Sequence, residues 1–217
     1  MAGCSDAELV ALARPQWGTV TEMVEQEGIE VMVALDVSRS MLAQDIKPDR
    51  LSRAKREIAD LMTRLGGDEI GLVLFSGASF IQFPLTSDYG TALTFLDNAR
   101  PEVISQPGTA IGNAIRTAMT GFDMSRASQK VIVLITDGKD HQGDALTAAE
   151  AAAEQGVLLY TIGFGSPEGE PISEYNDRGE VVGYKVDQNG EVVLSRLDEA
   201  CPGRKCTSVG GLAAQNG

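Results

Sequence analysis

The chain has 217 residues, of which 43% are hydrophobic and only 5% aromatic, so it suits one globular domain with an aliphatic core. Its formal net charge of -13 repels phosphate groups, which excludes nucleic acid and anionic lipid as primary partners. No run of about 18 apolar residues occurs, and the first residues lack the basic and apolar parts of a signal peptide. We therefore expect the chain as written to be soluble, without direct membrane insertion.

The elements are predicted in chain order from hydrophobic periodicity. Residues 1–28 show no sustained period and form a lead-in segment. Short runs of apolar residues, rich in β-branched types, predict strands at 29–35, 69–75, 130–136 and 157–163. Apolar residues at helical spacing predict helices at 50–65, 87–96, 110–119 and 144–155.

One further strand, predicted at 79–85, alternates between apolar and polar residues. A tight turn at Gly77 and Ala78 separates it from the strand before, so these two strands are expected to pair antiparallel. The other strands are apolar throughout and alternate with helices, as in a parallel sheet covered on both faces. The predicted fold is α/β, Rossmann-like and doubly wound, with a mostly parallel sheet and one antiparallel edge strand.

The composition changes after Gly165. Residues 165–200 are acidic and rich in Gly, Pro, Asn and Asp, and two alternating segments flank Asn189-Gly190, a strong turn signal. This pattern predicts a β-hairpin attached to the main sheet. Residues 201–217 have little pattern and are expected to form a loosely ordered tail. Cys201 and Cys206 lie there, and whether they pair depends on the redox compartment.

Oxygen-bearing residues follow the predicted strands at three places. Asp36, Ser38 and Ser40 follow the first strand, Thr109 precedes a helix, and Asp137 follows the strand at 130–136. Ligands bind at the carboxyl ends of strands in open α/β sheets, so these residues are expected to converge. A set made only of oxygens suits a hard divalent ion, Mg²⁺ before Mn²⁺ or Ca²⁺.

Each of these residues also has a simpler structural interpretation. Asp36, Ser38 and Asp137 are typical turn residues, and Thr109 is a typical helix N-cap, which it could be while also binding a metal. Only the convergence of three loops favours a metal site. Turn and cap roles are expected for four other polar residues, namely Asp45, Asp49, Ser76 and Ser79.

The set Asp36-x-Ser38-x-Ser40, Thr109 and Asp137 resembles the metal-ion-dependent adhesion site of the von Willebrand factor type A family, over about 29–165. The resemblance implies that the two serines and Thr109 coordinate the ion directly, and that the two aspartates act mostly through water. It also implies that an acidic side chain of a partner protein completes the coordination. The sequence departs from the family at Arg39, where many members have Gly.

A narrower resemblance rests on the segments 36–42 and 45–51 and on the lead-in Ala13-Arg14-Pro15-Gln16. These are similar to the bacterial Bat-type (aerotolerance) proteins, which implies a membrane-anchored parent with the domain on the periplasmic side. The implied organisation is a lead-in at 1–28, an A-type domain at 29–200 and a tail at 201–217. Arg39, Asp140 and His141 are expected to form a partner-binding rim around the metal, and the alternative for Asp140 and His141 is a role as solvated loop residues.

The predicted function is a metal-dependent protein–protein interaction module and not an enzyme. A Mg²⁺-dependent phosphoryl-transfer enzyme with Asp36 as nucleophile is the first alternative. Such enzymes require a second aspartate close to the first, whereas position 38 is serine. A structural scaffold with a vestigial metal site is the second alternative.

Overall fold

The computed structural model describes residues 28–137 and 144–165, and five short strands beyond them. The later strands are β6 (Glu170–Pro171), β7 (Ser173–Tyr175), β8 (Val181–Tyr184), β9 (Leu194–Ser195) and β10 (Cys206–Ser208).

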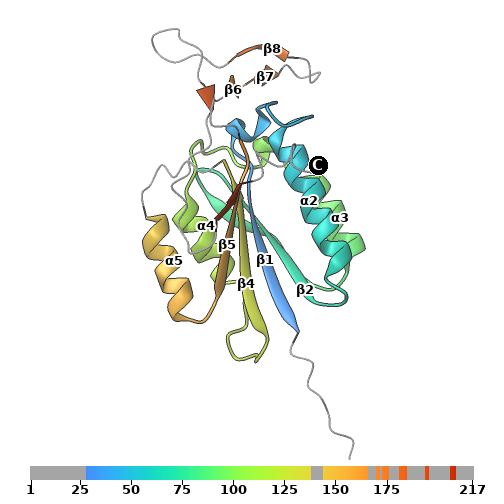
Figure 1. The fold of residues 1–217 in the computed structure, drawn as a ribbon, viewed down its shortest axis with the longest axis vertical. Helices are drawn as coiled ribbons and strands as arrows, with labels where there is room; N and C mark the ends of the chain where they lie inside the picture. Colours follow the sequence, from blue (N-terminus) through green and yellow to red (C-terminus); the bar gives the residue numbers. More distant parts are fainter. Residues whose placement is uncertain are drawn as a thin grey trace, which may run out of the picture.

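The central feature is a six-stranded sheet with the order β10-β5-β4-β1-β2-β3. Figure 1 shows its central strands β5, β4, β1 and β2 side by side. Its main strands are β1 (Ile29–Asp36), β2 (Glu69–Phe75), β3 (Ser79–Thr86), β4 (Gln129–Thr136) and β5 (Leu158–Gly163). Every neighbouring pair is parallel except β2 and β3, which run antiparallel. The predicted fold, a mostly parallel sheet with one antiparallel edge strand, is therefore confirmed.

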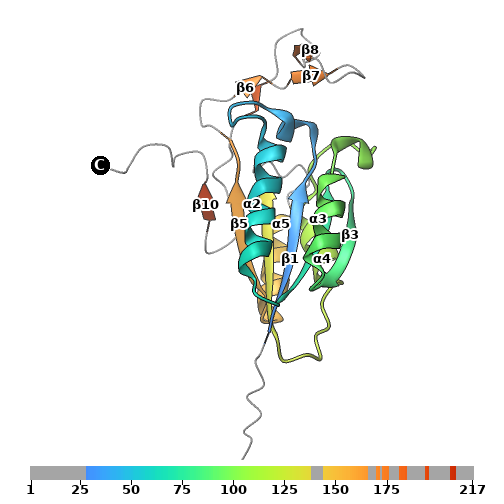
Figure 2. The ribbon, with the colours of Figure 1, turned by 90° about the vertical axis from the view of Figure 1, so that its right-hand side faces the viewer.

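Helices cover both faces of this sheet (Figures 1 and 2). The described helices are α2 (Arg50–Arg64), α3 (Tyr89–Asp97), α4 (Ile111–Met119) and α5 (Ala145–Glu154), with the 3₁₀ turns η1 (Arg39–Leu42) and η2 (Pro101–Val103). The pair α2 and α3 packs on one face and the pair α4 and α5 on the other. None of the helices in this part of the chain has the length and apolarity needed to cross a bilayer.

Strand β1 shows why the sheet is buried on both sides. Val31, Val33 and Leu35 face the core under α2 and α3, while Met32 and Ala34 face the core under α4 and α5. Successive side chains of a strand point to opposite faces, so an unbroken apolar run supplies both cores at once. The continuous apolar pattern thus places β1 in the centre of the sheet. Its polar last residue, Asp36, lies at the end of the sheet where the parallel strands finish.

The helix starts agree with the sequence in two places and differ in one. Asp49 Oδ1 accepts from Ser52 N at 2.7 Å, and Asp88 accepts from Thr91 N at 3.1 Å, so both aspartates cap helices. The N-cap of α4 is Ala110, without a side-chain hydrogen bond. The predicted capping role of Thr109 is therefore wrong.

The predicted hairpin around Asn189-Gly190 is wrong in its pairing. Strand β8 pairs with β7, and β9 pairs with β6, in two small sheets separate from the main one. Alternation identifies a strand but not its partner, since every alternating segment presents the same backbone groups. Residues 176–180 also contain Asn, Asp and Gly, so a second turn signal competed with the one at 189–190.

Part of the predicted tail belongs to the sheet. Strand β10 pairs with β5 in parallel, with Cys206 opposite Thr161 and Ser208 opposite Gly163. The expectation of a loosely ordered tail is wrong for these three residues. A three-residue strand has too short a pattern to be recognised, and only the open edge of β5 selects it.

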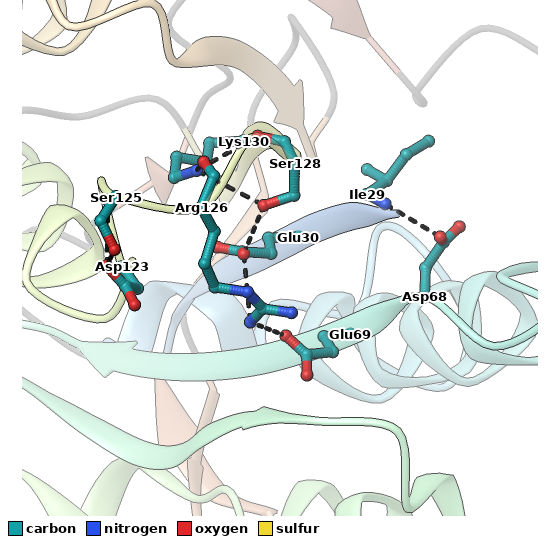
Figure 3. A network of polar contacts seen from close by, with 9 residues as sticks. All are labelled: Ile29, Glu30, Asp68, Glu69, Asp123, Ser125, Arg126, Ser128 and Lys130. Atoms are coloured by element: carbon teal, nitrogen blue, oxygen red, sulfur yellow. Dashed lines mark hydrogen bonds and ion pairs between the residues drawn. The ribbon is translucent and has the colours of Figure 1, made fainter. Parts of the chain in front are cut away.

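A polar cluster lies at the end of the sheet where β1, β2 and β4 begin, away from the end that carries Asp36 (Figure 3). Glu30 is 1% exposed, and its carboxylate accepts from Ser128 Oγ and lies 3.2 Å from Arg126 Nη1. The same guanidinium lies 2.5 Å from Glu69 Oε2, and Lys130 Nζ donates to Arg126 O at 2.8 Å. The cluster pairs the buried carboxylate of Glu30 with the guanidinium of Arg126, which is how buried charges are tolerated.

Replacing Arg126 by alanine is expected to lower the thermal midpoint, because buried Glu30 loses its nearest cation. Adding Glu30→Gln should recover part of the loss, because a neutral amide needs no cation. Circular dichroism melting of the two variants measures both effects. Arg53→Ala, which removes an exposed pair with Glu57, is the control and should shift the midpoint far less. Equal shifts for Arg126→Ala and Arg53→Ala would contradict the prediction.

Candidate metal centre

The first part of the site is the loop that leaves β1. Asp36 Oδ1 accepts a hydrogen bond from Ser38 N at 2.8 Å, which turns the chain sharply after the strand. The hydroxyls of Ser38 and Ser40 lie 2.9 Å apart. The alternate residues of the motif therefore share one side of the loop, as the D-x-S-x-S spacing predicted.

The residues between the polar ones anchor this loop. Val37 and Met41 are fully buried, and Val37 N donates to Phe75 O at 2.8 Å. Met41 N donates to Ser38 O at 3.0 Å, which closes the 3₁₀ turn η1. With two apolar side chains fixed in the core, the hydroxyls are held at the sheet edge, while Arg39 is exposed.

The second part of the site is the end of β4. Thr136 Oγ1 donates to Asp36 Oδ2 at 2.7 Å, so the ends of β1 and β4 are joined through side chains. Asp137 follows directly and is fully buried. The parallel register of β1 and β4 brings this about, since Leu35 is opposite Ile135. Two carboxylates thus occupy the same buried edge.

These carboxylates influence each other electrostatically. Burial, together with the negative charge of Asp137, raises the pKa of Asp36 from 3.8 to about 7. The hydrogen bonds from Ser38 and Thr136 lower the pKa of Asp36, but they do not offset burial and the neighbouring charge. A divalent cation beside two such groups would favour their ionised forms, so the electrostatics fit a cation site.

The third part of the site is the loop that carries Thr109, which is itself buried. Ser76 Oγ donates to Gly108 O at 2.9 Å, and Ala110 N donates to Ser76 O at 2.8 Å. Both neighbours of Thr109 are therefore fastened to Ser76, the first residue after β2. Since β2 lies beside β1, this attachment holds Thr109 at the same sheet edge as Asp36.

Gly77 brings the loop close to the β2–β3 turn. Its N–H donates to Gln106 O at 3.1 Å. A Cβ at position 77 would lie 2.4 Å from Pro107 O and 2.8 Å from Gln106 O, both backbone atoms. Only glycine permits this approach. The turn at Ser76 and Gly77 therefore fixes the position of the loop that carries Thr109, as the turn role expected for Ser76 requires.

Sequence reasoning missed Arg50. The periodicity assigned it to the polar face of α2, but it is fully buried. Its Nε and Nη2 lie 2.8 and 2.7 Å from the two carboxylate oxygens of Asp45, and its Nη1 lies 3.5 Å from Asp137 Oδ2. The sequence did contain a signal for this ion pair. Asp45 and Arg50 lie on either side of Lys47-Pro48, and a looped segment can bring two such opposite charges together.

The five predicted ligand positions all lie at the carboxyl edge of the sheet, on three loops. Arg39 is exposed beside them, while Asp140 and His141 lie outside the described residues. Within the described part of the chain, no group of three or more His, Cys, Asp or Glu side chains suits a metal. A cation here would therefore depend on hydroxyls as well as carboxylates, and this donor set fits a hard ion such as Mg²⁺.

An open parallel sheet with hydroxyl and carboxylate loops at its carboxyl edge is the arrangement of a known domain class. Residues 31–139 match the family model for the von Willebrand factor type A domain. The chain belongs to this family. Its members are in general protein-interaction modules rather than enzymes.

Within the family, the chain is similar to two solved Bat-type structures. One is the protein BatB from Bacteroides thetaiotaomicron, with 42% identity, a TM-score of 0.77, and coverage of 84% of this chain and 90% of that chain. The other is an aerotolerance-related membrane protein from Bacteroides fragilis, with 40% identity, a TM-score of 0.76, and coverage of 82% and 90%. The predicted resemblance to Bat-type proteins is confirmed.

Two further similarities are less close. A UPF0353 protein from Mycobacterium marinum is 31% identical over 80% of this chain and 54% of its own length. The chain thus spans about half the length of the curated relatives it matches. The mussel byssus protein PTMP1, solved with zinc in its metal-ion-dependent adhesion site, shares the fold at 22% identity and a TM-score of 0.57, covering 64% of this chain and 36% of that chain.

Proposed function

We propose that this domain is a metal-dependent protein-binding module, which holds a divalent cation at the carboxyl edge of its sheet and binds an acidic group of a partner protein through that cation. The observation that carries the proposal is the placement of two fully buried carboxylates, Asp36 and Asp137, at the ends of adjacent strands, beside the paired hydroxyls of Ser38 and Ser40. Buried like charges are costly unless cations accompany them, and the three buried carboxylates of Asp36, Asp45 and Asp137 exceed the single positive charge of Arg50.

The five residues of the proposed site would bind the ion in two ways. Ser38, Ser40 and Thr109 would coordinate the ion directly, and Asp36 and Asp137 would hold it mostly through water. Mg²⁺ is the preferred ion, with Mn²⁺ and Ca²⁺ as alternatives. An ion held mainly by neutral hydroxyls keeps much of its charge, so it attracts one more anionic oxygen.

The partner-binding rim is proposed to include Arg39, Asp140 and His141. Arg39 is exposed in η1, directly between the two serines of the motif. A cation in that place would attract the same partner carboxylate as the metal does. By analogy with the Bat-type relatives, we infer a membrane-anchored parent protein with this domain on the periplasmic side.

The geometry argues against a phosphoryl-transfer enzyme. Asp36 is fully buried, and each of its carboxylate oxygens already accepts a hydrogen bond, one from Ser38 N and one from Thr136 Oγ1. A nucleophilic carboxylate must reach the phosphorus atom of its substrate, and a fully buried side chain is poorly placed to do so. The scaffold alternative predicts no response to cations, so a titration separates it from the proposal.

Wild-type protein is expected to bind Mn²⁺ and to melt at a higher temperature with it than with a chelator. Binding to the native state alone adds about 2.7 kcal/mol of stability at a hundredfold excess over Kd. The bound Mn²⁺ should also accelerate the relaxation of acetate methyl protons in NMR, because the open coordination position admits a carboxylate. The double variant Ser38→Ala/Ser40→Ala should lose both effects.

The matched control is Ser79→Ala, which removes a hydroxyl bonded to Thr117 Oγ1 at 2.7 Å, away from the motif. It should retain Mn²⁺ binding and acetate relaxation. A wild-type thermal midpoint that does not change when Mn²⁺ is added would favour the alternative of a structural scaffold with a vestigial metal site. Normal Mn²⁺ binding without acetate relaxation would refute the partner-carboxylate mechanism while leaving the metal site intact.

A further inference from the structure

Arg50 links two of the three loops of the metal centre. It is the first residue of α2, and its backbone N donates to Ala43 O at 3.1 Å, directly after η1. Ala43 N in turn donates to Ser40 O at 3.1 Å. On its other side, the Arg50 guanidinium reaches Asp137 at the end of β4. One fully buried residue therefore connects the serine loop, through its backbone, with Asp137, through its side chain.

The guanidinium is held in place by Asp45. The carboxylate receives two hydrogen bonds from Arg50, from Nε at 2.8 Å and from Nη2 at 2.7 Å, and its side chain is 6% exposed. A two-point pair of this kind fixes the orientation of both partners. Asp45 Oδ1 also accepts from Ile46 N at 3.0 Å, so the carboxylate itself is tied to the backbone.

The charges explain what such a pair can do for a cation site. Asp36, Asp45 and Asp137 are three buried carboxylates, and Arg50 is the permanent cation that contacts two of them, Asp45 and Asp137. Since charges interact strongly where water is excluded, the guanidinium attracts Asp137 and repels an incoming cation. It therefore preserves the site without metal and weakens the binding of metal.

We propose that Arg50, fixed by Asp45, is the internal countercharge of the metal centre, which stabilises the buried carboxylates without metal and sets the affinity for the divalent ion. This inference rests on the proposed function, because it assumes that the edge binds a cation. It assigns a role to two residues outside the D-x-S-x-S, Thr and Asp set.

The test uses two substitutions with opposite electrostatic consequences. Asp45→Asn keeps an oxygen that can accept from Arg50 but removes a negative charge, so Mn²⁺ should bind about tenfold or more weakly. Arg50→Met removes the positive charge at similar length, so Mn²⁺ should bind about tenfold or more tightly. Isothermal titration calorimetry of the whole chain at one pH measures both. A residue needed only for packing would weaken binding in both variants.

Ser52→Ala is the matched control, because it removes a cap contact with Asp49 in the same turn without changing any charge. Its Mn²⁺ affinity should equal that of the wild type. Opposite shifts in the two charge variants support the inference, and equal directions or unchanged affinities overturn it. If Arg50→Met does not fold, Arg50→Gln, which also removes the positive charge, takes its place: tighter Mn²⁺ binding than in the wild type supports the inference, and equal or weaker binding overturns it.

The outcome for the wild type separates this inference from the proposed function. Absence of Mn²⁺ binding by the wild type would overturn both. Wild-type binding that Ser38→Ala/Ser40→Ala abolishes, combined with unchanged affinity in the Arg50 and Asp45 variants, would overturn only the inference on Arg50.

Discussion

Replacing Asp36 by asparagine is expected to weaken Mn²⁺ binding by about a hundredfold or more, because the site loses one of its two central negative charges. The same variant should be more stable than the metal-free wild type at pH 8. The neutral amide avoids the burial cost and the repulsion by Asp137 that raise the pKa of Asp36. Adding Mn²⁺ should reverse this order, because only the wild type gains stability from the ion.

The pH dependence of the metal-free protein follows from the same pKa. The folded-state pKa of Asp36 is about 7, above its ordinary value of 3.8, so the folded protein holds this proton more tightly than the unfolded chain. The associated stability is present below about pH 4 and is lost as the pH rises through about 7. The stability difference between Asp36→Asn and the wild type should therefore grow from pH 4 to pH 8.

Metal binding should show the opposite trend. The cation requires ionised Asp36, so Mn²⁺ affinity should rise about tenfold for each pH unit below about 7 and level off above it. Titration calorimetry between pH 5 and pH 8 measures this profile. Equal Mn²⁺ affinity in Asp36→Asn and the wild type, or a flat pH profile, would count against the proposed site.

Substituting Gly77 by alanine is expected to weaken Mn²⁺ binding by about tenfold or more. The added Cβ would lie 2.4 Å from Pro107 O, so the loop that carries Thr109 must move away from the β2–β3 turn. Crowding of this kind typically costs about 1–3 kcal/mol of stability, which chemical denaturation would detect. The affinity loss is expected because Thr109 leaves the edge at which the other donors lie.

Gly90→Ala is the control for Gly77→Ala. Gly90 lies in α3, is exposed, and its added Cβ would meet only Asp88 Oδ1 at an ordinary 3.5 Å. This variant should bind Mn²⁺ as the wild type does. If Gly77→Ala keeps an affinity within about twofold of the wild type, the position of the Thr109 loop does not depend on this contact.

Several parts of the site were predictable because they follow from local pattern. The apolar run of β1 and the spacing of Asp36, Ser38 and Ser40 fall within one short segment, and their arrangement depends on a single turn. The parallel sheet then brings Asp137 to the same edge by its register alone. Long-range pairing matters here, but the rule for parallel α/β sheets supplies it.

Other parts were not predictable because their signal depends on a partner that is distant in space. Arg50 has the sequence context of an exposed helical arginine, and its burial results from Asp45 and Asp137 together. Ser76 has the sequence context of a turn residue, yet its hydroxyl donates a hydrogen bond to Gly108 O, 32 residues further along the chain. The pairing of β8 with β7 likewise depended on which of two turn signals was used.

The sequence on its own specified the D-x-S-x-S motif, the apolar strand β1 and the order of strands and helices. These features follow from local patterns, because side-chain direction repeats every two residues in a strand and every three to four residues in a helix. The tertiary structure alone decided how the donors are held. It placed the guanidinium of Arg50 between two aspartates, and it fastened the Thr109 loop to Ser76 and Gly77. The physical reason is that burial and charge compensation are properties of the packed site, so no local pattern encodes them.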